Sequence, residues 1–251
     1  MLGSIEFNEK IYKFDFDKPI DISIPITFQE NAVNAFYAPK AKAAPLKAGD
    51  FIGSVAKCSP VNFFDVQINP HGNGTHTECV GHIAKEQFSI NKNLKKFFAM
   101  ARLLTIEPEE QESGDLVVTL EQVKDTLGND WSFEALILRT LPNTDAKLTR
   151  QYSGTNPPYL STELLAYLAE KELKHLLLDL PSVDREEDGG KLAGHKAFWQ
   201  YPENPRMDAT ITEMIYVPNE IEDGLYLLNL QICSFELDAA PSKPVLYKLI
   251  I

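Results

Sequence analysis

A strand, a helix and a second strand follow one another within residues 134–180. Residues 134–140 form the continuous apolar run of a buried strand. Ser161 is placed to cap a helix, and residues 175–180 form a second apolar run. The leucines of that helix that are expected to point inward are Leu164, Leu165, Leu168 and Leu173. This order predicts a layered domain of sheet and helices.

Strand and helix signals continue on both sides of this unit. Residues 101–107 and 115–118 are strand candidates, and Thr119 with Gln122 has the capping-box spacing of a helix that Gly128 would end. An edge strand is expected at residues 21–26, a long loop at 31–50, and β-rich segments at 209–217, 225–237 and 245–251. Because the chain has no internal repeat, low-complexity tract or linker, residues 1–251 are expected to form one domain.

Charge and composition narrow the classes of partner. A net charge of −12 opposes binding to phosphate backbones and anionic lipids, so neither nucleic acid nor membrane partners are expected. No stretch approaches the roughly 20 apolar residues of a membrane span, and the first residues do not resemble a secretory signal. Cys58, Cys79 and Cys233 lie far apart without a CxxC pair, which favours a reducing, cytoplasmic location.

Three of the five histidines, together with one glutamate, fall within twelve consecutive residues. Imidazole and carboxylate groups bind zinc, manganese or iron. Residues two apart in a strand face the same side, so His76 and Glu78 can converge, and the turn 72–74 can fold His71 back toward them. His82 lies close enough to accept a proton from a metal-bound water. The cluster therefore predicts a metal site, against the alternative that these histidines only form hydrogen bonds.

Two further residues have structural interpretations. His175 stands at the junction of a helix and a strand and is expected to be structural. Cys79 is expected on the opposite strand face from the ligands as a small buried residue, with a thiolate ligand as the alternative.

The histidine cluster resembles the signature of the cyclase family, which includes bacterial arylformamidases (kynurenine formamidases). That signature reads His-x-Gly-Thr-His-x-Asp-x-Pro-x-His, and the segment from Gly74-Thr-His76 through Glu78 to His82 matches its spacing. Gly72 stands where the first histidine is expected, Glu78 replaces the aspartate, and Val80 replaces the proline. The similarity continues at residues 179–184, Asp-Leu-Pro-Ser-Val-Asp, which match a second motif, Asp-x-x-Ser-x-Asp, and runs from about residue 21 to 245.

The resemblance implies a binuclear metal site in which Glu78 bridges two ions. A later histidine and glutamate of the family correspond to His195 and Glu213, with Glu220 as an alternative to Glu213. The implied ligands are His71, His76, Glu78, His195 and Glu213. They would hold one or two divalent ions, with zinc as the first expectation and manganese as the alternative. Ser182 and Asp184 are expected near the substrate pocket, although they and Asp179 could equally form a turn or cap the next helix.

The resemblance also implies a fold and a reaction. The fold would be of the α/β (α+β) class, a cyclase-like β/β/α swivelling fold with a mixed, partly barrel-like sheet flanked by helices, assembled as homodimers or homotetramers. The implied function is metal-dependent hydrolysis of an amide or cyclic amide bond in a small molecule, foremost an N-formyl aromatic amine, with His82 as general base. Two alternatives remain, namely a metal- or ligand-binding homologue without turnover and a metal-dependent cyclase or dehydratase.

Overall fold

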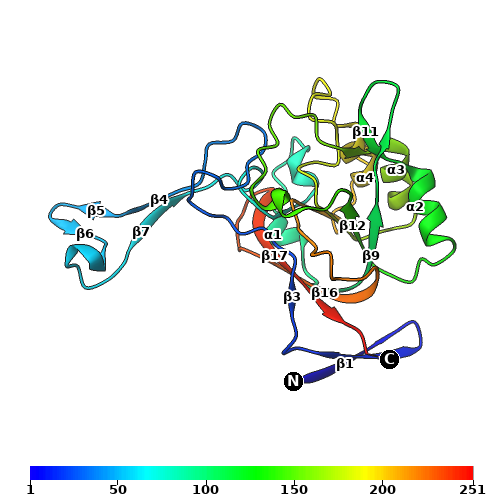
Figure 1. Cartoon of the computed structure of the whole chain (residues 1–251), viewed down its shortest axis with the longest axis horizontal. Coiled ribbons are helices and arrows are strands. Elements are labelled where there is room, and N and C mark those ends of the chain that lie inside the picture. The colour runs from blue at the N-terminus through cyan, green and yellow to red at the C-terminus, as the bar shows by residue number, and fades with distance from the viewer. Residues whose placement is uncertain (251) are drawn as a thin grey trace.

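Seven β-strands close into a barrel-like sheet in the computed structural model, which describes residues 1–250 (Figure 1). In ring order they are β16 (Gly224–Ile232), β9 (Phe98–Ile106), β12 (Ala135–Thr140), β14 (His175–Leu178), β15 (Thr210–Glu213), β8 (His76–Glu78) and β17 (Ala239–Lys248). Strands β9, β12, β14 and β15 run parallel, and the other pairs in the ring are antiparallel. Strand β3 (Ile20–Asp21) adds to the outside of β17. The expected mixed, barrel-like sheet is confirmed.

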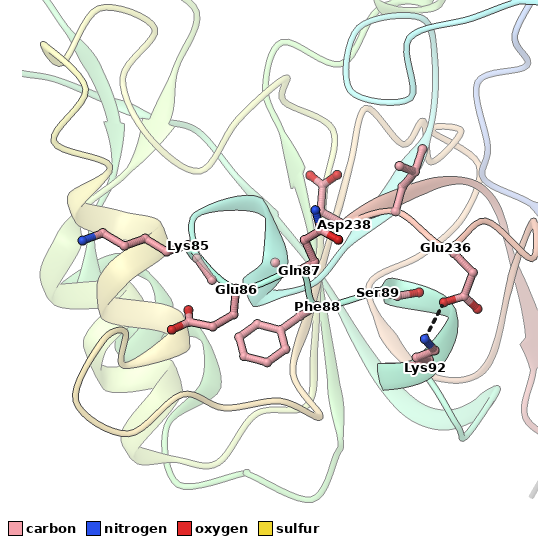
Figure 2. Close-up of a pocket in the computed structure, with 11 residues that line it drawn as sticks. Lys85, Glu86, Gln87, Phe88, Ser89, Lys92, Glu236 and Asp238 are labelled. Carbon is pink, nitrogen blue, oxygen red and sulfur yellow. Dashed lines mark ion pairs between the residues drawn. The ribbon is translucent and has the colours of Figure 1, made fainter.

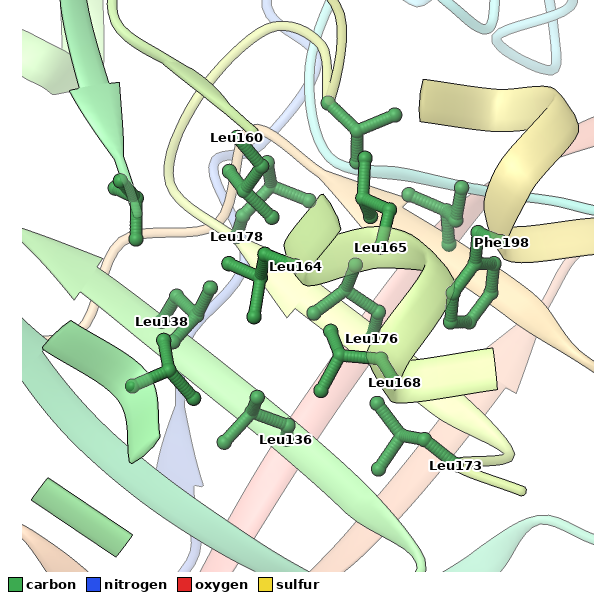
Figure 3. Packing of buried hydrophobic residues seen from close by; sticks show 14 of the residues in the cluster. Leu136, Leu138, Leu160, Leu164, Leu165, Leu168, Leu173, Leu176, Leu178 and Phe198 are labelled. Carbon is green, nitrogen blue, oxygen red and sulfur yellow. The ribbon is translucent and has the colours of Figure 1, made fainter. Parts of the chain in front are cut away.

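Helices pack against the parallel strands on one face. These are α2 (Leu120–Leu127), α3 (Thr162–Glu170) and α4 (Ala193–Trp199). Leu136 and Leu138 of β12 pack with Leu164 and Leu168 of α3 in one core cluster (Figure 3). The intervening residue Ile137 belongs to a second cluster on the other face of the sheet. Because both faces of β12 are covered, its first four residues are all apolar. The predicted strand, helix, strand unit is confirmed, except that α3 ends at Glu170, before the buried Leu173.

The helix boundaries follow from local sequence. Thr119 and Gln122 form the predicted capping box, with the Thr119 side chain accepting from Gln122 N and the Gln122 side chain accepting from Thr119 N. Gly128 follows α2 with a positive φ of 55°, a conformation that favours glycine. The Ser161 hydroxyl accepts a hydrogen bond from Leu164 N at the start of α3. Both caps act within four residues, so sequence alone identifies them.

Two hairpins lie outside the barrel. The hairpin of β1 (Leu2–Phe7) and β2 (Lys10–Asp15) packs Phe14 against the barrel residues Met100 and Leu227. The other hairpin is a ribbon that projects from the body, in which β4 (Lys42–Pro45) pairs with β7 (Phe64–Gln67) and β5 (Lys47–Ala48) pairs with β6 (Phe51–Ile52) (Figure 1).

The prediction of a loop over residues 31–50 was therefore wrong for the part that forms β4 and β5. Their partner strands come later in the chain, and local composition does not show such pairing.

Shorter elements complete the fold. They are β10 (Glu109–Glu110), β11 (Leu116–Val118) and β13 (Tyr159–Leu160) in a small side sheet, α1 (Ile90–Asn93), and 3₁₀ turns at Val55–Lys57, Val80–His82 and Asp145–Thr149. Within residues 1–250, no helix has the length and apolar character needed to cross a bilayer.

His175 has the structural position expected of it and provides a test of the fold. It begins β14, is buried, and its Nδ1 lies 2.9 Å from Thr210 Oγ1. Burial lowers its pKa to about 4, whereas an unfolded histidine titrates near 6.5. The folded protein therefore binds fewer protons than the unfolded chain between these two pH values, so the stability contributed by neutral His175 is present above pH ~6.5 and lost as pH falls toward ~4.

We expect His175→Gln to reduce the pH dependence of the free energy of unfolding. The difference between the folded and unfolded pKa of His175 corresponds to about 3 kcal/mol of that free energy. Urea denaturation of the wild type and the variant at pH 7, 6, 5 and 4.5 measures the effect. The wild type should lose stability more steeply over this interval, and parallel curves for the two proteins would contradict the assignment.

Candidate metal centre

Two neighbouring barrel strands place three buried ligand candidates side by side. In the register of β15 and β8, Glu213 lies opposite His76. His76 and Glu78 are two residues apart in β8 and so project to the same face. His76 Nε2 lies 3.3 Å from Glu213 Oε2, and all three side chains are almost fully buried. The strand alternation expected from the sequence thus holds for this part of the cluster.

The turn before β8 brings His71 to the same place. His71 Nδ1 lies 3.2 Å from Glu78 Oε2. The next residue, Gly72, occupies the position where the family signature has histidine. A Cβ atom at Gly72 would come within 2.3 Å of Ala38 Cβ and 2.9 Å of the Ala35 carbonyl oxygen. This backbone therefore excludes any side chain at position 72, and His71 is the histidine of the turn that contacts Glu78.

Helix α4 supplies a third histidine from a distant part of the chain. His195 Nε2 lies 3.1 Å from Glu78 Oε1 and 3.9 Å from Glu213 Oε1. Its other nitrogen, Nδ1, lies 2.6 Å from Asp184 Oδ2. Asp184 also accepts hydrogen bonds from the backbone N–H groups of Gly194 and His195. Asp184 thus fixes both the start of α4 and the orientation of the His195 ring.

Asp238 is a residue of this site that the sequence analysis missed. Its Oδ2 lies 2.9 Å from His71 Nε2 and 3.3 Å from His82 Nδ1. It directly precedes β17, whose first residue, Ala239, pairs with Glu78. No sequence motif marks this aspartate, because only the pairing of β17 with β8 brings it beside the histidines. Asp238 therefore connects the ligand candidate His71 with the candidate base His82.

The donor groups fit a divalent metal ion. His76 Nε2 and Glu78 Oε2 are buried without a hydrogen-bond partner, which is uncommon for buried polar atoms. Each of the three candidate ligand histidines has its second nitrogen beside an acceptor: His71 beside Asp238, His76 beside the Gly74 carbonyl at 3.1 Å, and His195 beside Asp184. Metal-ligating histidines are held in this way, and the mixed nitrogen and oxygen donors suit zinc or manganese.

Carboxylates dominate the electrostatics of the cluster. Burial would lower the pKa of His71, but the neighbouring carboxylates of Asp238 and Glu78 outweigh it and raise that pKa to about 10. The pKa of His195 rises to about 10 because Asp184 and Glu78 likewise outweigh burial. Burial would raise the pKa of Glu78, but the surrounding histidines hold it well below its usual range. The cluster thus favours positive charge at its centre.

A cavity of about 470 Å³ opens onto the cluster. His71, His82, His195 and Glu213 form part of its lining, as do Ser182, Asp184 and a segment that contains Phe36 and Tyr37. A separate cavity of about 600 Å³ shares Asp238 with the site but contains none of the histidines (Figure 2). An ion pair between Lys92 and Glu236 lies at that second cavity. The first cavity is therefore the candidate substrate site.

Other residues considered in the sequence lie apart from the cluster. Glu220 is exposed in a turn, so Glu213 is the glutamate that the structure places with the histidines. Asp179 is buried in an ion pair with Lys147 at 2.7 Å and also accepts from Thr140. Cys79 is buried, with Sγ 3.7 Å from the Phe88 carbonyl oxygen. Of the Asp179–Asp184 motif, only Ser182 and Asp184 border the cavity.

Known proteins share this fold. Residues 20–185 match the sequence family described as "Putative cyclase". A predicted metal-dependent hydrolase from Bacillus stearothermophilus superposes with a TM-score of 0.64 at 15% identity, covering 92% of this chain and 98% of that one. Isatin hydrolase A from Labrenzia aggregata superposes with a TM-score of 0.65 at 11% identity, covering 92% and 93%. An isatin hydrolase bound to the product analogue thioisatinate gives 0.64 at 13%, covering 92% of each chain.

Below a quarter identity, the superpositions establish a shared architecture over most of both chains. No curated protein shows a significant sequence match to this chain.

Removal of the Glu213 carboxylate should weaken metal binding. Loss of a residue that only supports a ligand by a hydrogen bond lowers metal affinity roughly 10- to 100-fold. We expect Glu213→Gln, which removes a candidate ligand itself, to lower the affinity for zinc by more than this. The matched control, Glu220→Gln, changes the same residue type at an exposed turn and should bind like the wild type. Competition with a chromogenic chelator measures both affinities. Equal loss in both variants, or loss only in the control, would contradict the placement of Glu213.

Asp238 should influence metal affinity through His71. We expect Asp238→Ala to weaken zinc binding by about 10- to 100-fold, because His71 would lose the acceptor that orients its ring. Glu236→Ala is the control, since Glu236 contacts Asn91 and Lys92 rather than the histidines. The same competition assay applies, with thermal unfolding of the metal-free proteins to check folding. Unchanged zinc affinity in a folded Asp238→Ala protein would show that Asp238 does not support the site.

Proposed function

The chain belongs to the cyclase family, and from that premise we propose that it is a metal-dependent hydrolase of amide or cyclic amide bonds in small molecules. The observation that carries the proposal is the buried group of His76, Glu78, His195 and Glu213 beside an open cavity. Two atoms of this group lack hydrogen-bond partners, and a ligated ion would satisfy them. The isatin hydrolases among the structural neighbours support a hydrolytic reaction.

The residues that would hold the metal are His71, His76, Glu78, His195 and Glu213. The two oxygens of Glu78 face different histidines, since Oε1 is close to His195 and Oε2 is close to His71. If two ions bind, Glu78 would help to hold both of them. Bound zinc or manganese would polarise the substrate carbonyl and lower the pKa of a coordinated water.

His82 is proposed to move the proton. It borders the cavity and is partly exposed, unlike the buried His76 and His195. Its Nδ1 lies beside Asp238, which favours the tautomer that carries the proton on Nδ1 and leaves Nε2 free to accept. His82 would take a proton from the attacking water as the new C–O bond forms. It would return that proton to the leaving nitrogen as the C–N bond breaks.

The cavity lining favours a planar aromatic substrate. Phe36 and Tyr37 contribute to its wall, and aromatic rings recognise other rings by stacking or edge contacts. The volume is in the range of small-molecule sites. An N-formyl aromatic amine, the substrate of an arylformamidase, combines a planar ring with one amide bond. We therefore propose arylformamidase-like activity, with cyclic aromatic amides as related substrates.

Hydrolysis of a substrate panel tests this proposal. The metal-free protein, prepared with a chelator, would be reconstituted with zinc or manganese and assayed against N-formyl anilines and cyclic aromatic amides. We expect hydrolysis that requires the added metal. A folded protein that binds metal but hydrolyses none of these compounds would favour a binding homologue, and a cyclised or dehydrated product would favour a lyase.

The proposed role of His82 predicts a separate outcome. His82→Ala should lower kcat by about 10²- to 10⁴-fold, because general acid–base catalysis contributes that much, while metal content stays the same. Glu220→Gln serves as the control and should keep full activity. Metal content would be measured on the same samples by atomic emission. Loss of metal together with activity in His82→Ala would make His82 a ligand instead of the base.

A further inference from the structure

We propose that Arg185 selects substrates that carry a carboxylate group, an inference that rests on the proposed function of the same cavity. Arg185 belongs to the lining of the cavity that opens onto the metal cluster. Among the described residues of this lining, it is the only lysine or arginine. A small molecule in the cavity can therefore present its amide bond to the metal cluster and a second, anionic group to Arg185.

A buried carboxylate holds Arg185 in place. Asp115 directly precedes β11 and is only 5% exposed. Its Oδ1 lies 3.2 Å from both Nε and Nη2 of Arg185. Asp115 also accepts hydrogen bonds from the side chains of Ser113, Asn156 and Tyr159. Because charge-assisted hydrogen bonds of this kind are strong and directional, the position of Asp115 fixes one edge of the guanidinium.

A second edge of the same guanidinium is free. Within residues 1–250, Nη1 of Arg185 makes no hydrogen bond or ion pair, and the side chain is 44% exposed. Guanidinium is planar, and two of its N–H groups can donate in parallel to the two oxygens of a carboxylate. The Nη1 and Nη2 edge of Arg185 is therefore available for a bidentate contact with a carboxylate in the cavity.

The acidic side chains next to Arg185 in the cavity lining already have hydrogen-bond donors. Glu186 and Asp188 each accept backbone N–H groups on both carboxylate oxygens. The donors are the N–H groups of Gly154, Asn156, Gly190 and Leu192. Hydrogen bonds to the charged form stabilise a carboxylate, so neither side chain needs a cationic ligand. This part of the cavity therefore favours a carboxylate over an ammonium group.

Binding of three matched compounds tests the inference without turnover. They are acetophenones, which have a carbonyl group but no amide bond, with a carboxylate, a nitro or an aminomethyl group at the para position. The nitro group has the shape of the carboxylate without its charge. Calorimetric titration of the zinc-loaded protein should give the carboxylate compound a Kd at least tenfold below the other two. Equal or weaker binding of the carboxylate compound would overturn the inference.

Variants of Arg185 place this preference at one side chain. Arg185→Gln should weaken binding of the carboxylate compound by about 10- to 100-fold and leave the nitro compound unchanged. Arg185→Lys keeps the charge without the planar fork and should bind the carboxylate compound with intermediate affinity. The control Arg150→Gln changes an exposed arginine outside the cavity lining and should bind like the wild type.

Thermal unfolding checks that each variant folds, because Arg185 also compensates the buried charge of Asp115. If Arg185→Gln does not fold, Arg185→Lys carries the same test. A carboxylate preference that persists undiminished in a folded Arg185 variant would overturn the inference.

Hydrolysis of the corresponding formanilides separates this inference from the proposed function. Arg185→Gln should raise KM for the carboxylate formanilide by about 10- to 100-fold with kcat unchanged, and should leave both constants for the nitro formanilide unaltered. Carboxylate-selective binding without hydrolysis would contradict the proposed function and still support the role of Arg185. Hydrolysis of both formanilides with the same KM in the wild type and in Arg185→Gln would overturn the role of Arg185 alone.

Discussion

Two buried carboxylates in the barrel wall, Glu78 and Glu213, set the requirements for the surrounding site. A carboxylate removed from water is strongly destabilising unless positive charge or hydrogen-bond donors compensate it. Here three histidines approach the two carboxylates, each through one nitrogen, while acceptors such as Asp184 and Asp238 hold the opposite nitrogen. Such an arrangement is well compensated when a cation sits at its centre. This compensation explains why β8 and β15 can bury acidic side chains, whereas the other barrel strands bury mainly apolar ones.

Steric packing explains how this chain departs from the family signature. The turn before β8 passes so close to Ala38 that position 72 must be glycine. The histidine one position earlier reaches Glu78, and Asp238 from the last strand lies against its far side. The one-residue shift of the histidine from position 72 to position 71 therefore still leaves an imidazole beside Glu78. Glycine replaces the signature histidine at position 72, and the neighbouring His71 is instead held by Asp238, which no local sequence motif connects to it.

The elements that were predicted correctly are those whose sequence signal lies within a few consecutive residues. The caps at Thr119 and Ser161 act within four residues, and the run at 135–140 is apolar because both of its faces are covered. The projecting ribbon of β4 to β7 and the N-terminal hairpin of β1 and β2 were not predicted. Strands β4 and β5 pair with β7 and β6 later in the chain, and most side chains of β1 and β2 are exposed or only partly buried, so neither gives a clear apolar pattern in the sequence. The long loop expected at 31–50 fails for this reason.

The sequence by itself determined the residue types of the site and the part of its geometry that alternation in one strand fixes, namely His76 beside Glu78. The family resemblance added His195 and Glu213 but not their positions in space. Only the tertiary structure decided that His195, 117 residues from Glu78, and Asp238, 156 residues from His82, meet at one point. The physical reason is that strand register and the docking of α4 are set by the whole core. No short segment contains the information for contacts that the core as a whole stabilises.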